Sequence, residues 1–424
     1  MNVLHLSAAD HGGAGIAAWR MHDSLRRLGH RSRLWVLERR TNDPDVRELG
    51  SRAFRWQRLA AKAALKLVTR PAWYFQDQRL SAGIGADDMA EARSLKPDVI
   101  VVHFISHFLA PADVLALQQS TGAPVLWNLL DMGLLTGGCH YAWDCPGYTR
   151  TCGSCPALRI SGTSDSSARI WTAKRDAVVR TRGWVVAGSS WLARQAAVSS
   201  LFEGRRIETL LLGVSPLAYA PGEQNALRAE LGAPGAERVV FFGAQRFDQK
   251  RKGMHLLMQA LVRLAETWPR GVALPVLLCA GNAVDFSGLR GRGYSLVELG
   301  FVGGPILAKA YAAADVFASP SIEDSGPMML NESMMCGTPV VAFRMGVAED
   351  LIESGLSGAI APLGDARAFA EALEQVLLWP AEKRARARAK CRDIGLEKCS
   401  PDRQLERFVA IAEACGREAG RVPA

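Results

Sequence analysis

Short apolar runs alternate with longer amphipathic runs along this chain of 424 residues, and this alternation most constrains its fold. Val3–Leu6 is followed by a glycine-rich turn, by an amphipathic run from about Ile16 to Leu28, and by a second apolar run over Ser32–Leu37. A short apolar run predicts a strand, and a longer run with apolar residues three or four positions apart predicts a helix. Repeated strand–helix–strand units predict a parallel sheet with helices on both faces.

The alternation starts again near Val239, so the chain is predicted to contain two such units. Gly213–Glu223, which holds two prolines and two glycines, is the best candidate for the linker between them. The sequence therefore predicts an α/β protein with two Rossmann-like, doubly wound domains, over residues 1–213 and 214–398, facing each other across a cleft. Ligands of open α/β sheets bind at the carboxyl ends of the strands, which would border that cleft.

Basic residues exceed acidic residues by nine, because 51 Lys and Arg stand against 42 Asp and Glu. Such a surplus suits an anionic partner, which a nucleotide, a nucleic acid or a lipid surface would each provide. The basic residues lack interleaved aromatic residues and no nucleic-acid-binding motif is present, so a nucleic-acid partner is not expected. The hydrophobic share of 49% is that of a globular protein and excludes a disordered chain.

The N-terminal residues Met1–Leu6 lack the basic start of a signal peptide and are predicted to form a buried strand. No uncharged apolar run reaches the roughly 18–20 residues that a membrane-spanning helix needs. We therefore expect a cytoplasmic protein, whose nine cysteines would be thiols or metal ligands rather than disulfides.

The segment that carries most chemistry lies between two apolar runs of the second unit. Gly326, Pro327 and Met328 stand where a helix would begin, and the N-terminus of that helix would attract a phosphate. Asp324 before the helix and Glu332 within it could accept hydrogen bonds from sugar hydroxyls. An acidic cap on a surface helix is the alternative interpretation of such a pair.

This segment, which ends in Cys336–Val341, resembles the E-x7-E signature of retaining glycosyltransferases of family four, which have the GT-B fold. Asp324 stands where the family usually has its first Glu, and Glu332 matches the second. An Asp there, with Pro327 three residues later, resembles a bacterial polysaccharide-assembly branch of the family. The resemblance implies that Glu332 binds the ribose of a nucleotide sugar and that Asp324 contacts the transferred sugar.

A basic segment after the first strand of the second unit resembles the diphosphate clamp of the same family. Lys252 and Gly253 match the family's Lys-Gly, whereas Ala244 occupies the position of the usual Arg. The guanidinium would then come from Arg246, which we favour, or from Arg251. An Arg and a Lys together suit a phosphate, and a solvated basic loop is the alternative. The resemblance also implies nucleotide or phosphate contacts from turns and strand ends, at Gly12, Gly13, Gly243, Gly281, Phe301, Val302, Gly326, Pro327 and Met328.

Four of the nine cysteines lie close together in the sequence, at Cys139, Cys145, Cys152 and Cys155. Four thiolates can bind zinc tetrahedrally, and Cys152-x-x-Cys155 has the spacing of a zinc knuckle. We therefore predict a structural zinc site in a Cys-rich insert over residues 139–155, with His140 as an alternative ligand. A redox pair and buried thiols are the other interpretations. A similar pattern of residues occurs in the same polysaccharide-assembly branch.

One position departs from the family near the predicted sugar site. Leu130 replaces a His that lies next to the transferred sugar, and Leu cannot donate a hydrogen bond. Either the donor differs, or activity is reduced, or His103 fills the role. His103 ends a predicted strand and matches another family His, although a structural role is equally expected there. Asp131 matches the family and is a candidate for acceptor or sugar contacts.

Residues 52–70 have the pattern of a basic amphipathic helix. Basic residues recur every four positions beside an apolar stripe, at Arg58, Lys62, Lys66 and Arg70 and at Trp56, Leu59, Ala63 and Leu67. This pattern suits an anionic membrane surface, or a helix that packs its stripe on the sheet. Family members often act on lipid-linked acceptors, so the resemblance favours peripheral attachment at the inner face of the cell membrane.

Together the motifs predict a retaining glycosyltransferase that needs no catalytic metal. It would move a sugar from a nucleoside-diphosphate sugar, a UDP- or GDP-sugar first, to a growing polysaccharide or a lipid-linked glycan. In the family the last helix, here expected over residues 399–424, returns to the first domain. The alternative is a catalytically impaired homologue that binds nucleotide or glycan or serves in assembly, which Leu130, Ala244 and Asp324 would support.

Overall fold

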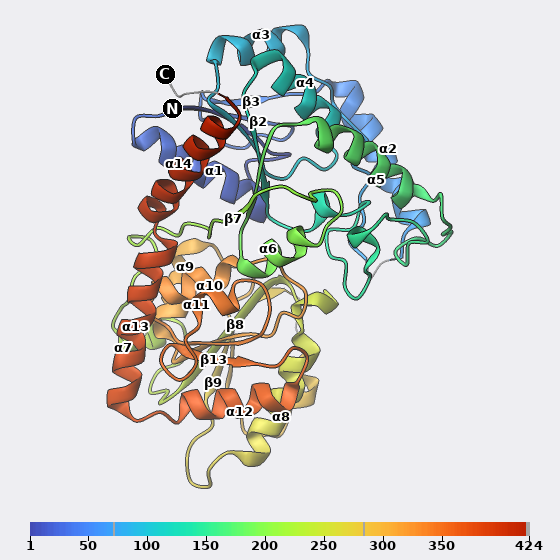
Figure 1. The fold of residues 1–424 in the computed structure, drawn as a ribbon. Coiled ribbons are helices and arrows are strands. Elements are labelled where there is room, and N and C mark those ends of the chain that lie inside the picture. Colours follow the sequence, from blue (N-terminus) through green and yellow to red (C-terminus); the bar gives the residue numbers. More distant parts are fainter. Residues whose placement is uncertain (71–72, 283–284, 421–424) are drawn as a thin grey trace. The chain divides into compact units, whose positions relative to one another are not determined.

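The computed structural model describes residues 1–70, 73–282 and 285–420 of the chain. It forms two compact units (Figure 1): unit 1 contains Met1–Leu210 and Gln404–Ala424, and unit 2 contains Leu211–Arg403. The sequence placed these boundaries after residues 213 and 398. Residues 421–424, the end of the expected C-terminal helix, lie outside the described residues.

Unit 1 holds a seven-stranded parallel sheet in the order β3-β2-β1-β4-β5-β6-β7. Its strands are β1 (Asn2–Leu6), β2 (Arg31–Val36), β3 (Val46–Glu48), β4 (Val99–Val102), β5 (Val125–Leu129), β6 (Gly183–Ala187) and β7 (Ile207–Thr209). Its helices are α1 (Gly12–Arg27), α2 (Arg52–Val68), α3 (Ala86–Leu95), α4 (Pro111–Thr121), α5 (Ser166–Arg180), α6 (Ser190–Ala197) and α14 (Pro401–Glu418), with short 3-10 helices η1 (Gly133–Leu135) and η2 (Gly147–Thr149). Leu405 and Phe408 of α14 pack with Val3 and Val101 of the sheet, so the last helix returns to the N-terminal sheet.

Unit 2 holds a six-stranded parallel sheet in the order β10-β9-β8-β11-β12-β13. Its strands are β8 (Val239–Arg246), β9 (Val276–Asn282), β10 (Leu296–Glu298), β11 (Val316–Ser319), β12 (Val340–Phe343) and β13 (Gly358–Ala361). Its helices are α7 (Gln224–Glu230), α8 (Met254–Thr267), α9 (Gly304–Ala313), α10 (Met328–Met335), α11 (Ala348–Leu351), α12 (Ala366–Leu377) and α13 (Ala381–Cys399), with 3-10 helices η3 (Lys250–Lys252) and η4 (Ser287–Leu289). Each sheet is therefore of the doubly wound kind that the sequence predicted.

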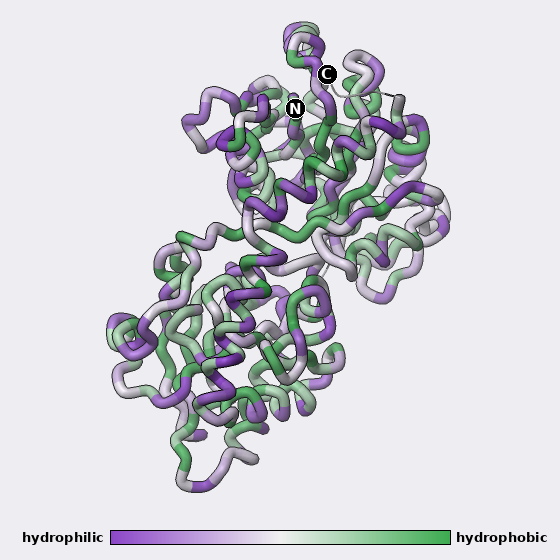
Figure 2. Tube along the Cα trace, turned by 60° about the vertical axis from the view of Figure 1, so that its left-hand side comes forward, coloured by the Kyte–Doolittle hydropathy of each residue, from purple (hydrophilic) through white to green (hydrophobic). Residues whose placement is uncertain are grey.

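The strands are apolar throughout because both faces of each sheet are covered. Successive strand residues point to opposite faces, and in β8 Val240 and Phe242 join one hydrophobic cluster while Val239 and Phe241 join another. Hydrophobic stretches accordingly recur along the chain and are separated by hydrophilic ones (Figure 2). No described helix has the length and apolar character that crossing a membrane requires.

The basic helix α13 uses its charges inside unit 2. Arg388 donates hydrogen bonds to the carbonyl oxygens of Ala312 and Ala314, and Arg392 donates to the carbonyl oxygen of Tyr219. The bonds from Arg388 satisfy carbonyl groups at the end of α9, where a helix leaves acceptors without partners. These two charges of the basic helix therefore stabilise the fold.

Candidate active site

A cavity of about 90 Å³ opens at the carboxyl edge of the unit 2 sheet. It lies where β8, β11 and the first turn of α10 meet, which is the edge at which open α/β sheets bind ligands. Four residues that the sequence proposed for the donor site line it: Gly243, Lys252, Pro327 and Met328. Phe242, Phe247, Phe317 and Met329 give the cavity an apolar wall.

Asp324 holds two cations at the rim of this cavity. Its Oδ2 accepts hydrogen bonds from Lys252 Nζ at 2.5 Å and from Arg251 Nη1 at 3.1 Å. Burial by itself raises the pKa of the Asp324 carboxyl, but Lys252 and Arg251 outweigh this and hold the pKa below its ordinary value. Asp324 is therefore ionised at neutral pH and holds both cations, of which Lys252 lines the cavity.

Helix α10 begins at Met328 directly behind Asp324 and has no side-chain cap at Pro327. Its first turn lines the cavity, so its positive dipole end points at the place where a phosphate would lie. Gly326 N–H donates to Asp324 Oδ1 at 3.4 Å, which ties the loop to the helix. Lys252 and the first turn of α10 thus line the same cavity, and Arg251 binds the same carboxylate as Lys252.

Glu332 lies one turn further along α10 and is buried. It accepts a hydrogen bond from the hydroxyl of Tyr311, at 3.2 Å. Burial and the neighbouring Glu332 raise the pKa of Tyr311, so the phenol keeps its proton and donates it. The carboxylate is consequently held in one orientation by a residue of helix α9.

Gly253 allows the basic loop to approach the strand that leads to Asp324. It has a φ of +66°, and a Cβ placed there would lie 1.8 Å from the carbonyl oxygen of Pro320. Only glycine fits such a left-handed position at this distance. Gly281 at the end of β9 is similarly constrained, because its Cβ would lie 2.0 Å from the carbonyl oxygen of Ala244.

The structure does not bring Arg246, the guanidinium that the sequence favoured, to this cluster. Its side chain is exposed and forms an ion pair with Asp248, whose carboxylate raises the pKa of Arg246. Arg251, the alternative, contacts Asp324 instead. The two residues differ because β8 is irregular between Ala244 and Arg246, whereas Arg251 lies in η3 together with Lys252.

The remaining donor-side candidates occupy turns and strand ends. Phe301 and Val302 follow β10, Gly281 lies near the end of β9, and Phe301 is exposed. In unit 1, Gly12 and Gly13 are exposed in the first turn of α1, after β1. Their predicted nucleotide or phosphate contacts stay predictions.

His103 lies at the carboxyl end of β4 but is buried. Asn128 Nδ2 donates to its Nδ1 at 2.9 Å, so its Nε2 carries the proton and donates to His5 Nδ1, also at 2.9 Å. Burial lowers the pKa of His103 to about 3, which keeps the ring neutral. Both ring nitrogens are engaged within the fold, and this arrangement favours the structural role over a sugar contact.

Asp131 lies after β5 and is partly exposed. Its Oδ2 is 2.7 Å from His140 Nδ1, and its Oδ1 accepts from Gly133 N–H at 2.7 Å. Buried Lys174 donates to the carbonyl oxygens of Gly133 and Thr136, both at 2.5 Å, and so fixes the loop. The Asp131 carboxylate is therefore held in a fixed position by hydrogen bonds, on a loop at the carboxyl edge of the unit 1 sheet.

The four clustered cysteines do line one cavity, of about 20 Å³. The Cys139 thiol donates to the sulfur of Cys155, which lowers the pKa of Cys155 to about 7, and Gly137 N–H donates to Cys152 Sγ at 3.1 Å. Across the described ranges 1–70, 73–282 and 285–420, however, no three His, Cys, Asp or Glu side chains are arranged to hold a metal ion. The predicted zinc site is thus not supported, and His140 is engaged by Asp131.

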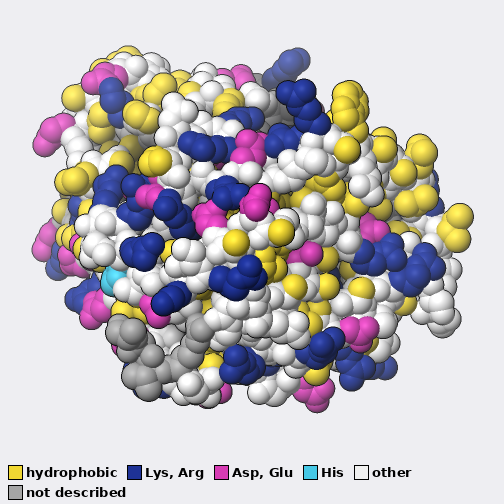
Figure 3. Space-filling view, turned by 90° about the horizontal axis from the view of Figure 1, so that it is seen from above, with side chains coloured by type: hydrophobic (Ala, Val, Ile, Leu, Met, Phe, Trp, Pro, Cys, Tyr) yellow, Lys and Arg dark blue, Asp and Glu magenta, His cyan; other side chains and the backbone are white. Residues whose placement is uncertain are grey.

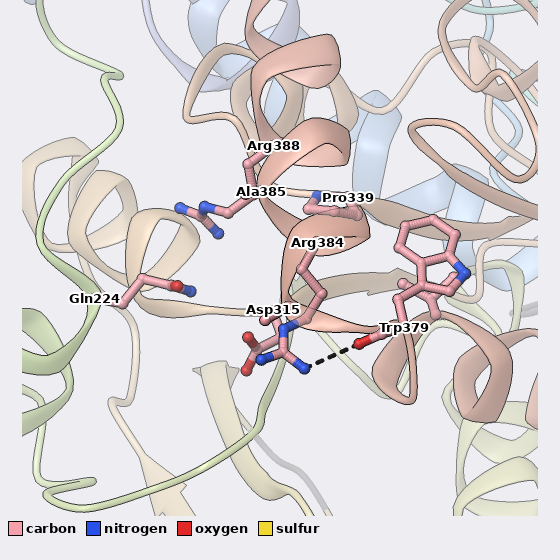
Figure 4. Close-up of a pocket in the computed structure, with 9 residues that line it drawn as sticks. Gln224, Asp315, Pro339, Trp379, Arg384, Ala385 and Arg388 are labelled. Atoms are coloured by element: carbon pink, nitrogen blue, oxygen red, sulfur yellow. Dashed lines mark hydrogen bonds between the residues drawn. The ribbon is translucent and has the colours of Figure 1, made fainter.

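A second cavity of unit 2, of about 190 Å³, lies at the amino ends of β11 and β12 (Figure 4). The charged side chains of this cavity form hydrogen bonds within unit 2. Asp315 accepts hydrogen bonds from Arg228 and from Val239 N–H, and Arg384 donates one to the carbonyl oxygen of Trp379. Because this is the opposite end of the strands from the first turn of α10, the cavity does not belong to the candidate donor site.

Sequence comparisons relate part of the chain, most of it in unit 2, to known glycosyltransferases. Residues 236–378 match the model described as "Glycosyl transferases group 1". The chain is 36% identical over 186 residues to a D-inositol 3-phosphate glycosyltransferase of Saccharomonospora viridis, covering 41% of this chain and 42% of that one. It is 36% identical over 171 residues to a phosphatidyl-myo-inositol mannosyltransferase of Mycobacterium leprae, covering 39% and 42%. The aligned segments span less than half of each relative.

Comparison with solved structures extends the similarity in fold to nearly the whole chain. Anabaena HepE in complex with UDP has a TM-score of 0.65 at 16% identity, covering 98% of this chain and 100% of that one. Sucrose-phosphate synthase of Thermosynechococcus elongatus has a TM-score of 0.64 at 18% identity, covering 99% and 98%. The fold is GT-B, as the sequence predicted. The glycosyl transferases group 1 model matches the part of unit 2 that holds Asp324 and Glu332.

Two residues of the site were not found by sequence reasoning. Tyr311, on helix α9, donates a hydrogen bond to Glu332 on helix α10. The sequence offered one clue to this contact: Tyr311 is a single tyrosine in an alanine-rich helix, and a buried tyrosine hydroxyl usually has a hydrogen-bond partner. Gly346 packs against the loop that holds Asp324, because a Cβ there would lie 2.6 Å from the carbonyl oxygen of Asp324. A single glycine after a strand carried no distinguishing signal.

Proposed function

We propose that this protein is a retaining glycosyltransferase that uses a nucleoside-diphosphate sugar. The observation that carries the proposal is that Lys252 and the first turn of α10 line one cavity, while Asp324 binds both Lys252 and Arg251. Diphosphate is the leaving group whose charge such a site would stabilise. The match to glycosyl transferases group 1 over residues 236–378 supports the same chemistry.

A UDP-sugar or a GDP-sugar is the donor class that we propose. HepE of Anabaena was solved with UDP, with UDP and glucose, and with UDP-glucose, and its fold is similar to that of this chain. In our proposal Glu332 accepts hydrogen bonds from the ribose hydroxyls, while Asp324 contacts the sugar. Phe301 and Val302 then offer backbone atoms to the base.

The mechanism that we propose stabilises the departing diphosphate electrostatically. Negative charge grows on the leaving oxygen in the transition state, and donors fixed in advance around that oxygen lower the barrier. Lys252 supplies a point charge, Arg251 a planar fork, and α10 its first-turn N–H groups. Asp324 keeps the two cations in place before the donor arrives, so little reorganisation is needed.

The acceptor that we propose is a growing polysaccharide or a lipid-linked glycan, contacted from unit 1 by Asp131. The location that goes with this acceptor is the cytoplasm, at the inner face of the cell membrane. A non-catalytic homologue that binds nucleotide or glycan is the second candidate, because Leu130 and Ala244 replace a histidine and an arginine of the family. Turnover with any nucleotide sugar would decide against it.

A thermal-shift panel of UDP, GDP, ADP, dTDP and CMP with their sugar conjugates is the first test. A ligand at about 100 times its dissociation constant adds about 2.7 kcal/mol of stability, so binding of one nucleotide family should raise the melting temperature clearly. That result would also name the donor class. If none of the nucleotides raised the melting temperature, the proposed donor site would be contradicted.

Lys252→Ala and Glu332→Ala should each reduce sugar transfer at least about tenfold, because a charge-assisted contact contributes roughly 1.5–3 kcal/mol. Steady-state transfer kinetics with the donor identified by the panel would measure this. Lys309→Ala is the matched control, since Lys309 is an exposed lysine of unit 2 paired with Glu230. Near wild-type kinetics in both site variants would overturn the proposed function.

A further inference from the structure

Four cysteines inside unit 1 form a group of reactive side chains that the proposed function does not use. Cys139, Cys145, Cys152 and Cys155 line one cavity of about 20 Å³. On the face shown in Figure 3, in contrast, basic and acidic side chains are interspersed, so that their charges offset one another. The cysteine cavity is therefore the stronger candidate for a further chemical role.

Cys139 and Cys155 contact each other in this cavity. The Cys139 thiol donates a hydrogen bond to Cys155 Sγ, and Ala157 N–H donates to the same sulfur. Both bonds stabilise negative charge on Cys155, and the thiolate is the form of cysteine that reacts with oxidants. Both cysteines are buried, so bulky reagents are kept from them. The contact thus joins a nucleophilic sulfur to a second thiol.

Buried cysteines of unit 2 are placed differently. Cys336 donates to the carbonyl oxygen of Ala308 at 3.7 Å, and Cys391 donates to that of Ser357 at 3.3 Å. These two thiols are held by backbone groups and are not aimed at another sulfur. Burial alone therefore does not bring thiols of this chain into contact.

The other two cysteines of the cavity do not complete a metal site with this pair. Cys152 Sγ accepts from Gly137 N–H at 3.1 Å, and among the described residues no three His, Cys, Asp or Glu side chains are arranged to hold a metal ion. The cavity has room for about one water-sized molecule. Two adjacent thiols without a metal can instead be oxidised to a disulfide by a small oxidant.

We propose that Cys139 and Cys155 form a reversible disulfide when a peroxide oxidises them. The Cys155 thiolate attacks one peroxide oxygen, the O–O bond breaks, and Cys155 becomes a sulfenic acid while hydroxide leaves. The Cys139 sulfur then attacks the sulfenic sulfur, and the sulfenic hydroxyl leaves as water with the Cys139 proton. The two sulfurs together lose two electrons, which the peroxide takes up. An added dithiol restores both thiols by exchange.

The disulfide would join the loop of Asp131 to the start of α5. Cys139 directly precedes His140, whose Nδ1 is 2.7 Å from Asp131 Oδ2. Cys155 N–H donates to Asp165 Oδ2 at 2.8 Å, and the Asp165 side chain caps α5. A cross-link constrains the unfolded chain, so the oxidised protein should be more stable than the reduced protein. The inference does not depend on the donor chemistry.

Peptide mapping of the full chain under non-reducing conditions tests the proposal. Trypsin separates Cys139 and Cys145 from Cys152 and Cys155, because an arginine follows each of these two pairs. Cys145→Ser with Cys152→Ser keeps the proposed pair, and Cys139→Ser with Cys155→Ser removes it, while both variants keep one cysteine in each peptide. After hydrogen peroxide, the wild type and the first variant should give cross-linked peptides that dithiothreitol separates. The second variant should give at least about tenfold less.

Thermal melts of the same samples give a second measurement. In dithiothreitol both double variants should melt within a few degrees of the wild type, since serine is close to cysteine in size. After peroxide, the wild type and the first variant should melt at least about 3 °C higher than in dithiothreitol, and the second variant should not. Equal cross-linking of the two variants, or a folded first variant without the cross-link, would refute the proposal.

The wild type by itself decides the matter if a variant fails to fold. Chymotrypsin cleaves after Tyr141 and so separates Cys139 from Cys145 in the trypsin digest. A cross-link from the peptide of Cys139 is the expected result, and one from the peptide of Cys145 in its place would refute the proposal. Stoichiometric zinc in the purified protein that Cys139→Ser removes would assign the cavity to a metal and refute it as well.

Discussion

At the scale of single residues, two carboxylates of the site differ in what neutralises them. Asp324 lies against two cations, whereas Glu332 is buried beside the neutral phenol of Tyr311. A carboxylate between cations orders those cations, and a carboxylate that accepts from a phenol is itself ordered. The two residues thus differ in their surroundings, as they differ in the roles that the family resemblance gave them.

Tyr311→Phe should raise the KM for the nucleotide sugar at least several-fold and leave kcat little changed. The variant removes the hydrogen bond that orients Glu332, and a hydrogen bond to a charged group contributes roughly 1.5–3 kcal/mol. Tyr294→Phe is the control, because Tyr294 donates to the carbonyl oxygen of Leu261 in the same unit. Steady-state kinetics and thermal melts of both variants would show this. If the two variants lost equal stability and neither changed KM, Tyr311 would have a structural role only.

At the scale of elements, the site depends on how close η3 can approach the end of β11. The short turn between Lys252 and α8 places Gly253 against the carbonyl oxygen of Pro320, and the loop from Pro320 leads to Asp324. The lysine that holds the carboxylate is therefore positioned by backbone contact and not by its own side chain alone.

Gly253→Ala should abolish the nucleotide-dependent thermal shift and destabilise unit 2 by more than about 2 kcal/mol, because the new methyl group cannot share space with a carbonyl oxygen. Gly271→Ala is the control: its φ of +79° is similarly left-handed, but no atom lies within 4 Å of the added Cβ. The control should lose only about 1 kcal/mol and keep the shift. Equal behaviour of the two variants in differential scanning fluorimetry would argue against the close approach.

At the scale of the whole molecule, titratable histidines are distributed unequally between the two units. Seven of the eight histidines belong to unit 1, and the eighth is His255 in unit 2. Burial lowers the pKa of His103 to about 3 and the pKa values of His22 and His107 to about 4. These rings are neutral in the folded state and take up protons near pH 6.5 once the chain unfolds.

Unit 1 should consequently lose stability before unit 2 as the pH falls from about 7 to about 5. A lowered histidine pKa means that the unfolded chain binds more protons, so the stability is fully present above about pH 6.5 and declines toward the folded-state pKa. Each such histidine contributes at most about 1.4 kcal/mol per pH unit. Hydrogen exchange resolved by peptide would follow the two units separately. Parallel loss of protection in both units would contradict this.

The fold could be predicted from the sequence because the patterns that indicate it are local. The strand–helix alternation, the proline- and glycine-rich stretch near residue 213 and the long apolar strands each follow from periodicity within a few residues. It also proposed a donor loop, since Asp324, Glu332 and Lys252 lie in short motifs. It could not choose between Arg246 and Arg251 for the second cation, because their positions depend on the irregular end of β8 and on η3.

The sequence by itself determined the doubly wound units, the basic amphipathic helix and the residues at the candidate donor loop, because chain neighbours encode them. Only the tertiary structure decided three other points. His103 became an interior residue because His5 and Asn128 come to it from adjacent strands. The four cysteines met in one cavity without the geometry of a metal site in the described part of the chain. The apolar stripe of α2 faces outward because Phe54 and Leu65, on the other side of the same helix, pack against the hydrophobic clusters of unit 1. Helical periodicity specifies two faces, and only packing against distant segments decides which of them meets water.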